Sequence, residues 1–319
     1  MTARNVASVL LTSLAASTII IAAQQPPNAP PLPAVDRANY RPAAPYEAVR
    51  TSDPTLPDQT LYRPKDLARL GNSKMPIVAW GNGGCAANGG SSAEPALMEF
   101  ASQGYLVGAG GTPPPAGARG PASVDVPASK QTATHVLTDF IDWAIKENSR
   151  SDSAYRGKID TTKIALAGHS CGGLQAIALA GDKRLTTVVI LNSGTIPRAG
   201  IPTPDGGTRA PVGYLPSSED DLKHFRTPVL YLIGGPTDVA YQGSESDFKA
   251  IVEVPLFNGN YPVGHGATYR DERGGLFTAV ATDWLDWQLK GKKDLAKRFT
   301  GPSCALCSAP HWTVKRKNM

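Results

Sequence analysis

One pentapeptide of the chain places a serine between two glycines, at residues 168–172 in the pattern G-x-S-x-G. An apolar run at 163–167 precedes it and a helix-compatible stretch at 174–180 follows it, which predicts the order strand, sharp turn, helix. Such a turn raises the serine hydroxyl above the edge of a sheet, where it can act as a nucleophile. The glycines are expected because strand and helix backbones pack closely there and leave no room for a Cβ. The alternative interpretation is a structural Gly-Ser turn.

A serine hydroxyl needs a base within hydrogen-bond distance to become a good nucleophile. We favour His265 as that base, because it follows the last predicted strand and precedes the closing helix. Gly264 and Gly266 give the backbone freedom to direct the imidazole toward Ser170. The alternative is an exposed loop histidine. The remaining histidines lie in a helical segment, inside the G-x-S-x-G turn, in a polar stretch and near the C-terminus: His135, His169, His224 and His311.

A carboxylate is expected beside the histidine, to hold its tautomer and to stabilise the imidazolium. Asp238 follows the apolar strand predicted at 228–233 through a short loop, and functional groups collect at the carboxyl ends of such strands. The competing aspartates are interpreted as solvated surface charges: Asp220, Asp221 and Asp247. The resulting chain order of serine, acid and histidine is the one expected for an α/β-hydrolase.

Acyl transfer also requires preorganised donors for the developing oxyanion. We expect one from the backbone N–H of Cys171 and the other from the glycine-rich loop after the strand at 76–80, from Asn82 or, failing that, Gly83. Residues 81–86 also match G-x-G-x-x-A, but the following strand ends without the acidic residue that a dinucleotide site needs. Cys171 as nucleophile is disfavoured, because its frame would require glycine where the chain has histidine.

The elements that would position these residues alternate along the chain. Alternation of strand and helix predicts an α/β fold with a mostly parallel sheet and helices on both faces. The sequence contains neither an internal repeat nor a clear second domain, and residues 193–227 have mostly loop composition. Strands are predicted at 46–50, 60–62, 76–80, 105–109, 163–167, 186–191, 228–233 and 252–257, and the strand at 252–257 is the last one. Helices are predicted at 93–103, 131–146, 174–180 and 277–289.

The composition is that of a globular protein: 319 residues, 41% hydrophobic, 18% charged, with a net charge of +5. Basic residues are scattered, apart from runs at 290–293 and 315–317, and they are not interleaved with aromatics. Nucleic acid is therefore a disfavoured partner. The basic run near the C-terminus is interpreted as a solvated tail.

The first 23 residues read as an export signal, with Arg4 followed by an apolar stretch at 6–23 that ends in two alanines. An uncleaved anchor is the alternative, but five serines and threonines dilute a run that is barely long enough to span a bilayer. Residues 24–45 are rich in proline and alanine and predict an extended lead-in. We thus expect a secreted or periplasmic protein without stable membrane insertion after signal removal.

These motifs together resemble the α/β-hydrolase superfamily, and within it secreted esterases of the dienelactone-hydrolase-like and polyester-hydrolase (cutinase-like) branch. The resemblance runs from about 62 to 301 and rests on the loop at 77–84, the G-x-S-x-G turn, Asp238 and the Gly-His-Gly at 264–266. It implies an eight-stranded sheet, a Ser-His-Asp triad, no metal and no organic cofactor. Two departures stand out: dienelactone hydrolases use a cysteine nucleophile, and many relatives have His-Gly where this chain has Trp80-Gly81.

Four cysteines are an even number, which in an exported chain favours disulfides. Three pairings are possible, and we prefer Cys85–Cys171 with Cys304–Cys307, because this joins neighbours in the expected fold. Zinc binding by all four is disfavoured, since only one close pair exists. The domain prediction is a signal at 1–23, the lead-in at 24–45, a catalytic domain at 46–301 and a C-terminal tail at 302–319.

The sequence therefore predicts a secreted carboxylic ester hydrolase that acts on a small-molecule or polymeric ester through an acyl-enzyme intermediate. Ser170, Asp238 and His265 are the expected triad, with Asn82 and Cys171 as the oxyanion donors. Two alternatives stay open: an amidase or peptidase with the same triad, and an exported binding protein that uses the scaffold without catalysis.

Overall fold

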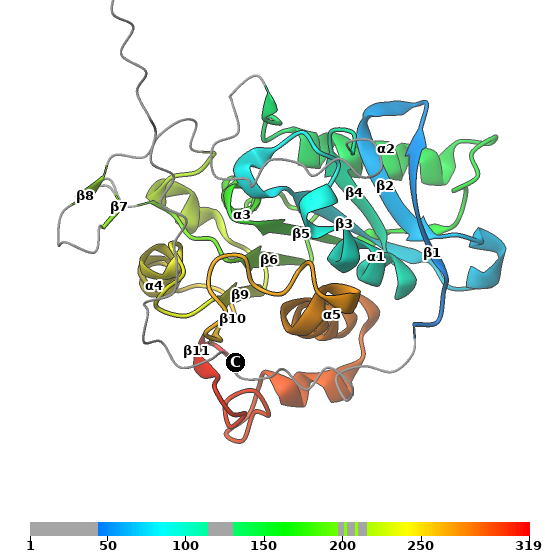
Figure 1. Ribbon diagram of the computed structural model, residues 1–319. Helices are drawn as coiled ribbons and strands as arrows, with labels where there is room; N and C mark the ends of the chain where they lie inside the picture. Colours follow the sequence, from blue (N-terminus) through cyan, green and yellow to red (C-terminus); the bar gives the residue numbers. More distant parts are fainter. Residues whose placement is uncertain (1–43, 114–129, 197–200, 203–207, 210–215) are drawn as a thin grey trace, which may run out of the picture. The chain divides into compact units, whose positions relative to one another are not determined.

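A nine-stranded, mostly parallel sheet runs through the described part of the chain, with strand order β1-β2-β4-β3-β5-β6-β9-β10-β11 (Figure 1). The computed structural model describes residues 44–113, 130–196, 201–202, 208–209 and 216–319. Six strands, β3 to β6, β9 and β10, pair in parallel, while β1, β2 and β11 are antiparallel additions at the two edges. The six parallel strands therefore all end at the same edge of the sheet.

The strands of this sheet are β1 (Ala48–Asp53), β2 (Leu56–Pro64), β3 (Met75–Gly81), β4 (Leu106–Gly110), β5 (Ile159–His169), β6 (Thr187–Leu191), β9 (Val229–Ile233), β10 (Leu256–Asn260) and β11 (Thr313–Lys317). A separate antiparallel pair is formed by β7 (Ile201–Pro202) and β8 (Thr208–Arg209). The central strands β3, β4, β6 and β9 are buried along their whole length. Both faces of a parallel sheet are normally covered, which explains why these strands read as continuous apolar runs.

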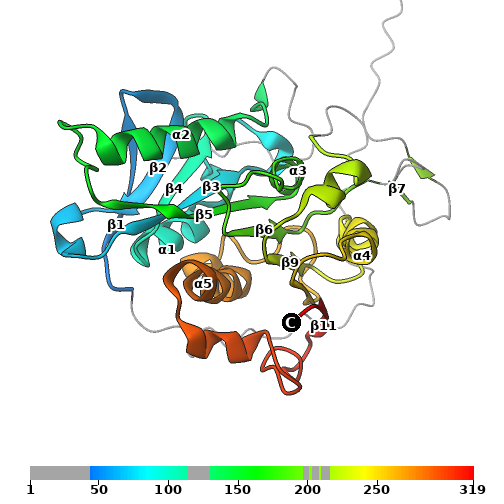
Figure 2. The same cartoon turned by 180° about the vertical axis from the view of Figure 1, so that it is seen from behind.

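The α-helices are α1 (Glu94–Ser102), α2 (Val136–Ser149), α3 (Cys171–Ala178), α4 (Tyr241–Ala250) and α5 (Gly275–Lys290). The described ranges also contain short 3-10 helices: η1 (Leu67–Leu70), η2 (Gly83–Cys85), η3 (Ser91–Ala93), η5 (Glu219–His224), η6 (Glu272–Gly274) and η7 (Lys293–Arg298). Helices α1 and α5 cover one face of the sheet, and α2 and α3 cover the other (Figures 1 and 2).

Each face of the sheet has its own apolar core. Phe140 and Trp143 of α2 pack against the sheet on one side, and Trp284 of α5 with Phe100 of α1 on the other. All but Trp143, which is 6% exposed, are fully buried. Burial of these aromatic side chains, together with the many aliphatic side chains of both clusters, holds the two helical layers on the sheet.

The α/β class with a mostly parallel sheet and helices on both faces is thus confirmed, but two strand predictions need correction. The sheet has a ninth strand, because β11 lies inside the segment 302–319 that was predicted to be a tail. Residues 313–317 lack an apolar run, and an edge strand rich in lysine is a common way to discourage pairing with other chains. The predicted solvated basic run is accordingly half-buried, and Lys315 is paired with Glu245.

The second correction concerns β10, predicted at 252–257 and observed at Leu256–Asn260. Pro255 has no N–H to donate to a neighbouring strand, and Val252 is 55% exposed, so pairing begins only after the proline. Helix α2 likewise begins at Val136, five residues later than predicted.

Several predictions concern residues outside the described ranges. The export signal at 1–23 and nearly all of the lead-in at 24–45 fall there. Over the described residues, no helix combines the length and apolar character needed to cross a membrane.

Candidate functional site

Ser170 occupies the turn between β5 and α3 with a left-handed backbone, φ 54° and ψ −122°. The glycines around it are required by space: a Cβ on Gly168 would lie 2.2 Å from the Gly172 carbonyl oxygen, and one on Gly172 would lie 2.0 Å from the Gly81 carbonyl. This is the close packing of strand and helix that the sequence predicts. A positive φ at a non-glycine residue is strained, and such strain collects at functional sites.

His265 lies in the loop between β10 and α5, and its ring faces Ser170. Its Nε2 is 2.9 Å from the Ser170 Oγ, and 21% of its side chain is exposed. Gly264 adopts φ 72°, as expected for a residue that aims the loop. Gly266 does not have a positive φ, and a Cβ at this position would meet open space. Of the two flanking glycines, only Gly264 therefore has a backbone conformation that favours glycine.

Asp238 follows β9 in the loop before α4 and lies directly behind the histidine. Its buried Oδ1 is 2.7 Å from the His265 Nδ1 and also accepts the Ala240 N–H. Oδ2 accepts the Gly234 N–H at 2.9 Å. Burial by itself would raise the pKa of Asp238, but the hydrogen bond and charge of His265 and the two amides outweigh it and hold the pKa below its usual value.

With Asp238 ionised, the histidine Nδ1 carries the proton that it donates to Oδ1. Nε2 is then left as an acceptor for the Ser170 hydroxyl. The structure thus brings the three predicted residues into one chain of hydrogen bonds, although 95 residues separate Ser170 from His265. Such a chain can remove a proton from the serine as it attacks an electrophilic carbon.

The two amides expected to bind an oxyanion lie on either side of a close contact between η2 and α3. A Cβ on Gly172 would lie 2.6 Å from the Asn82 nitrogen, so the Asn82 loop touches the turn. Among the described residues, neither the Asn82 nor the Cys171 N–H donates a hydrogen bond. The Asn82 side chain has a separate role: its Nδ2 donates to the carbonyls of Ala86 and Gly110 and so anchors the loop.

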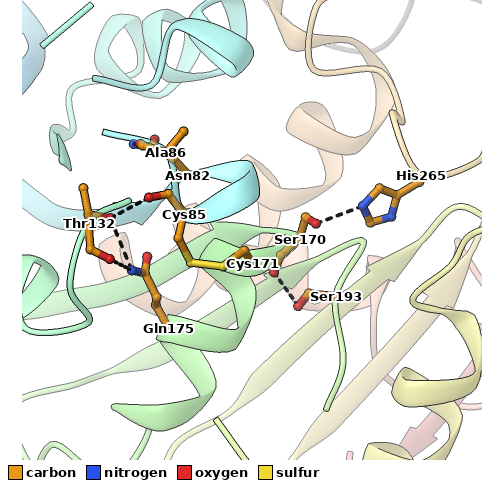
Figure 3. The surroundings of a disulfide bond; sticks show 9 residues. All are labelled: Asn82, Cys85, Ala86, Thr132, Ser170, Cys171, Gln175, Ser193 and His265. Carbon is orange, nitrogen blue, oxygen red and sulfur yellow. Dashed lines mark hydrogen bonds between the residues drawn. A yellow bond between two sulfur atoms is a disulfide. The ribbon is translucent and has the colours of Figure 1, made fainter. Parts of the chain in front are cut away.

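A disulfide joins these two segments. Cys85 pairs with Cys171, the residue after the serine, and Figure 3 shows the bond on one side of Ser170 with the His265 ring on the other. Cys304 pairs with Cys307, so the preferred pairing of the three possible ones is present. Thr132 donates its N–H to the Cys85 carbonyl at 2.7 Å, which braces the turn from a third segment.

The interpretation of Asp247 as a solvated surface charge is wrong. Asp247 is fully buried, and it accepts hydrogen bonds from the Thr195 N–H and the Tyr231 hydroxyl. Burial raises its pKa to about 6 despite these donors. Helix α4 has a polar sequence, and the sequence pattern did not reveal that Asp247 faces the sheet. Asp220 is exposed and Asp221 half-buried, both in the 3-10 helix η5.

His169 lies at the end of β5, immediately before the serine. Its Nε2 donates to the His265 carbonyl oxygen at 3.0 Å, and its ring packs edge-on against Tyr269, 4.9 Å between centroids. Loss of hydration around the ring, helped by the neighbouring His265, lowers the pKa of His169 to about 4. His169 therefore stays neutral near pH 7 and supports the loop of His265 through the His265 carbonyl.

Sequence reasoning missed three polar residues that touch this network. Asn192 donates to Asp238 Oδ2 at 2.6 Å, Tyr269 donates to the Asn192 Oδ1, and Ser193 donates to the Ser170 carbonyl at 2.7 Å. Asn192 and Ser193 directly follow β6. The rule that selected Asp238, a polar residue at the carboxyl end of an apolar strand, would also have selected them.

Within the described ranges, no three histidine, cysteine or carboxylate side chains gather in a way that could hold a metal ion. No protein-family model and no curated protein matches the chain.

Proposed function

We propose that this chain is a serine hydrolase with an α/β-hydrolase fold that cleaves carboxylic esters through an acyl-enzyme. The observation that carries the proposal is the continuous hydrogen-bond chain from Ser170 Oγ through His265 to the buried Asp238. Its position supports the proposal too, because the three residues follow β5, β9 and β10 at the carboxyl edge of a parallel sheet.

The first half-reaction begins when the Ser170 oxygen attacks the ester carbonyl while its proton passes to His265 Nε2. Asp238 stabilises the imidazolium that results. The carbonyl oxygen becomes an oxyanion within reach of the Asn82 and Cys171 amides, which are fixed before the substrate arrives. The tetrahedral intermediate then collapses: the bond to the alcohol oxygen breaks, and His265 returns the proton to the departing alcohol.

The second half-reaction repeats these steps with water. His265 takes a proton from the water as it attacks the acyl-enzyme, and the same two amides hold the second oxyanion. When the bond to Ser170 breaks, His265 returns the proton to the serine oxygen and releases the acid. No other group has to supply or remove a proton.

We also propose that the protein acts outside the cytoplasm. Two disulfides among the described residues favour an oxidising compartment. The export signal predicted at 1–23 is consistent with this proposal, and N-terminal sequencing of the protein from the culture medium or periplasm would test it.

The function is tested by Ser170→Ala with a short-chain p-nitrophenyl ester. We expect kcat/KM to fall by roughly 10⁴-fold or more, with the circular dichroism spectrum and Tm close to those of the wild type. An anilide with the same acyl group, assayed in parallel, distinguishes an esterase from an amidase. Turnover by Ser170→Ala near the wild-type rate would refute the assignment, and a wild-type protein inactive on both substrates would favour a binding function.

A further inference from the structure

A single buried side chain connects the loop that holds the acid with the loop that holds the base. The Asn192 Nδ2 donates to Asp238 Oδ2 at 2.6 Å and to the Gly264 carbonyl at 3.1 Å. We propose that Asn192 is a positioning residue that couples Asp238 to His265, so that the pair keeps one geometry throughout turnover. This inference rests on the proposed function, because it concerns the residues assigned to that reaction.

The backbone at Asn192 is specialised for this position. Its φ is 45°, in the left-handed region that asparagine tolerates better than most residues other than glycine. Its N–H donates to the Leu232 carbonyl at 2.8 Å, which ties the residue to β9, the strand that precedes Asp238. The side chain is fully buried, so bulk solvent does not compete for its hydrogen-bond partners.

Tyr269 fixes the orientation of the amide. Its hydroxyl donates to the Asn192 Oδ1, so the NH₂ group of Asn192 must face Asp238 and Gly264. Burial, reinforced by the Asp238 charge, raises the pKa of Tyr269 well above its usual value, so the hydroxyl keeps its proton and remains a donor. The same ring packs against His169, which holds the His265 carbonyl.

The two carboxylate oxygens of Asp238 thereby have different partners. Oδ1 accepts from His265 and the Ala240 amide, and Oδ2 accepts from Asn192 and the Gly234 amide. The acid and base loops also meet directly, through the Gly264 N–H and the Gly234 carbonyl at 2.8 Å. Removing the Asn192 amide would leave Asp238 Oδ2 and the Gly264 carbonyl each without one donor. Both acceptors belong to residues that set the orientation of His265.

Such a loss should affect the chemical step more than substrate binding, because the Asn192 side chain holds Asp238 and the loop of His265. A small displacement of the base from the attacking oxygen is enough to slow the reaction strongly. We expect Asn192→Gly, which tolerates the left-handed backbone but lacks the amide, to lower kcat on the order of 10- to 100-fold. KM should stay within about twofold.

The second readout is the proton on His265 Nδ1, observed by NMR as a low-field resonance. In the wild type this proton is held by Asp238, and we expect it to exchange with water faster in Asn192→Gly. Tyr269→Phe removes only the hydroxyl that orients the amide, so it should cause a smaller change in the same direction. Asn258→Ala is the matched control, because Asn258 is an equally buried amide in β10 whose side chain forms its hydrogen bonds with Ser244 and Asn260 instead.

The outcomes separate the two proposals. Reduced kcat with faster exchange in Asn192→Gly, and neither change in Asn258→Ala, would support the coupling role. An unchanged kcat and an unchanged resonance would overturn it, even if Tm fell. If the wild type hydrolyses no ester, the proposed function fails, and the resonance alone decides whether Asn192 holds the pair. Should Asn192→Gly not fold, Tyr269→Phe answers the same question: unchanged kcat and exchange would overturn the role.

Discussion

The two disulfides of this protein differ in how far apart along the chain the segments that they join are. Cys85–Cys171 lies in the site region, where Cys85 and Ser170 both have positive φ and where the bond joins residues 86 positions apart. Cys304–Cys307 lies in the C-terminal region, defined here as residues 293–319, and closes a turn between residues three positions apart. The first bond brings distant segments together, whereas the second reinforces a local one.

The surrounding contacts differ in the same sense. The turn at Cys304 is already held by local backbone bonds, from the Ala305 N–H to the Lys297 carbonyl and from Leu306 to Arg298. At the site, the Asn82 loop and the turn of Ser170 come from different strands, and the disulfide is the covalent link between them (Figure 3). A disulfide that closes a longer loop removes more entropy from the unfolded chain. The Cys85–Cys171 bond should therefore contribute more to the unfolding free energy than the Cys304–Cys307 bond.

The largest effect is expected when the site disulfide is removed in Cys85→Ala/Cys171→Ala. The chain-entropy relation gives a loss of about 4.5 kcal/mol in unfolding free energy for this loop length, or a fall in Tm of about 10 °C. We also expect kcat to fall roughly tenfold, because the two oxyanion amides lose their common support. Calorimetry and ester kinetics at 20 °C measure both. A fall in Tm with full kcat would show that the bond serves stability alone.

The next effect concerns pH and again distinguishes the site region. The pKa of His169 is about 4 in the folded protein against an ordinary 6.5, so the unfolded chain binds the proton first as pH falls. Its contribution to stability is therefore complete above pH 6.5 and is lost between pH 6.5 and 4. His169→Phe removes this titrating group. The drop in unfolding free energy from pH 7 to pH 4 should therefore be smaller than in the wild type by about 2.5 kcal/mol.

Urea titrations at the two pH values measure that difference. Cys304→Ala/Cys307→Ala is the control, because it weakens the fold without touching His169 and should keep the wild-type dependence on pH. If the unfolding free energy of His169→Phe and of the wild type dropped equally from pH 7 to pH 4, His169 would not be held neutral in the folded protein.

The smallest effect is expected from Cys304→Ala/Cys307→Ala itself. The same entropy relation gives about 2 kcal/mol for so short a loop, or roughly 4 °C in Tm, and kcat should equal that of the wild type. If this variant lost as much stability or activity as the site variant, the contrast between the two regions would be wrong.

The contrast also explains what could be predicted from the amino-acid sequence. The alternation of apolar runs with helical stretches predicted the α/β sheet. The G-x-S-x-G motif selected Ser170, and places after predicted strands selected Asp238 and His265, which the structure joins by hydrogen bonds. Both predictions depend on local patterns. Strand β11 was missed because an edge strand needs backbone pairing more than apolar side chains. The burial of Asp247 was missed because its partners, Thr195 and Tyr231, come from distant parts of the chain.

The central claim is that Ser170 becomes a nucleophile through His265 and Asp238, and covalent labelling tests it most directly. The wild-type protein is treated with a fluorophosphonate probe, digested and mapped by mass spectrometry. The account predicts one adduct, on the peptide that contains Ser170, and its absence in Ser170→Ala and near absence in His265→Ala. An unlabelled protein, or a label on another residue with Ser170 unmodified, would contradict it.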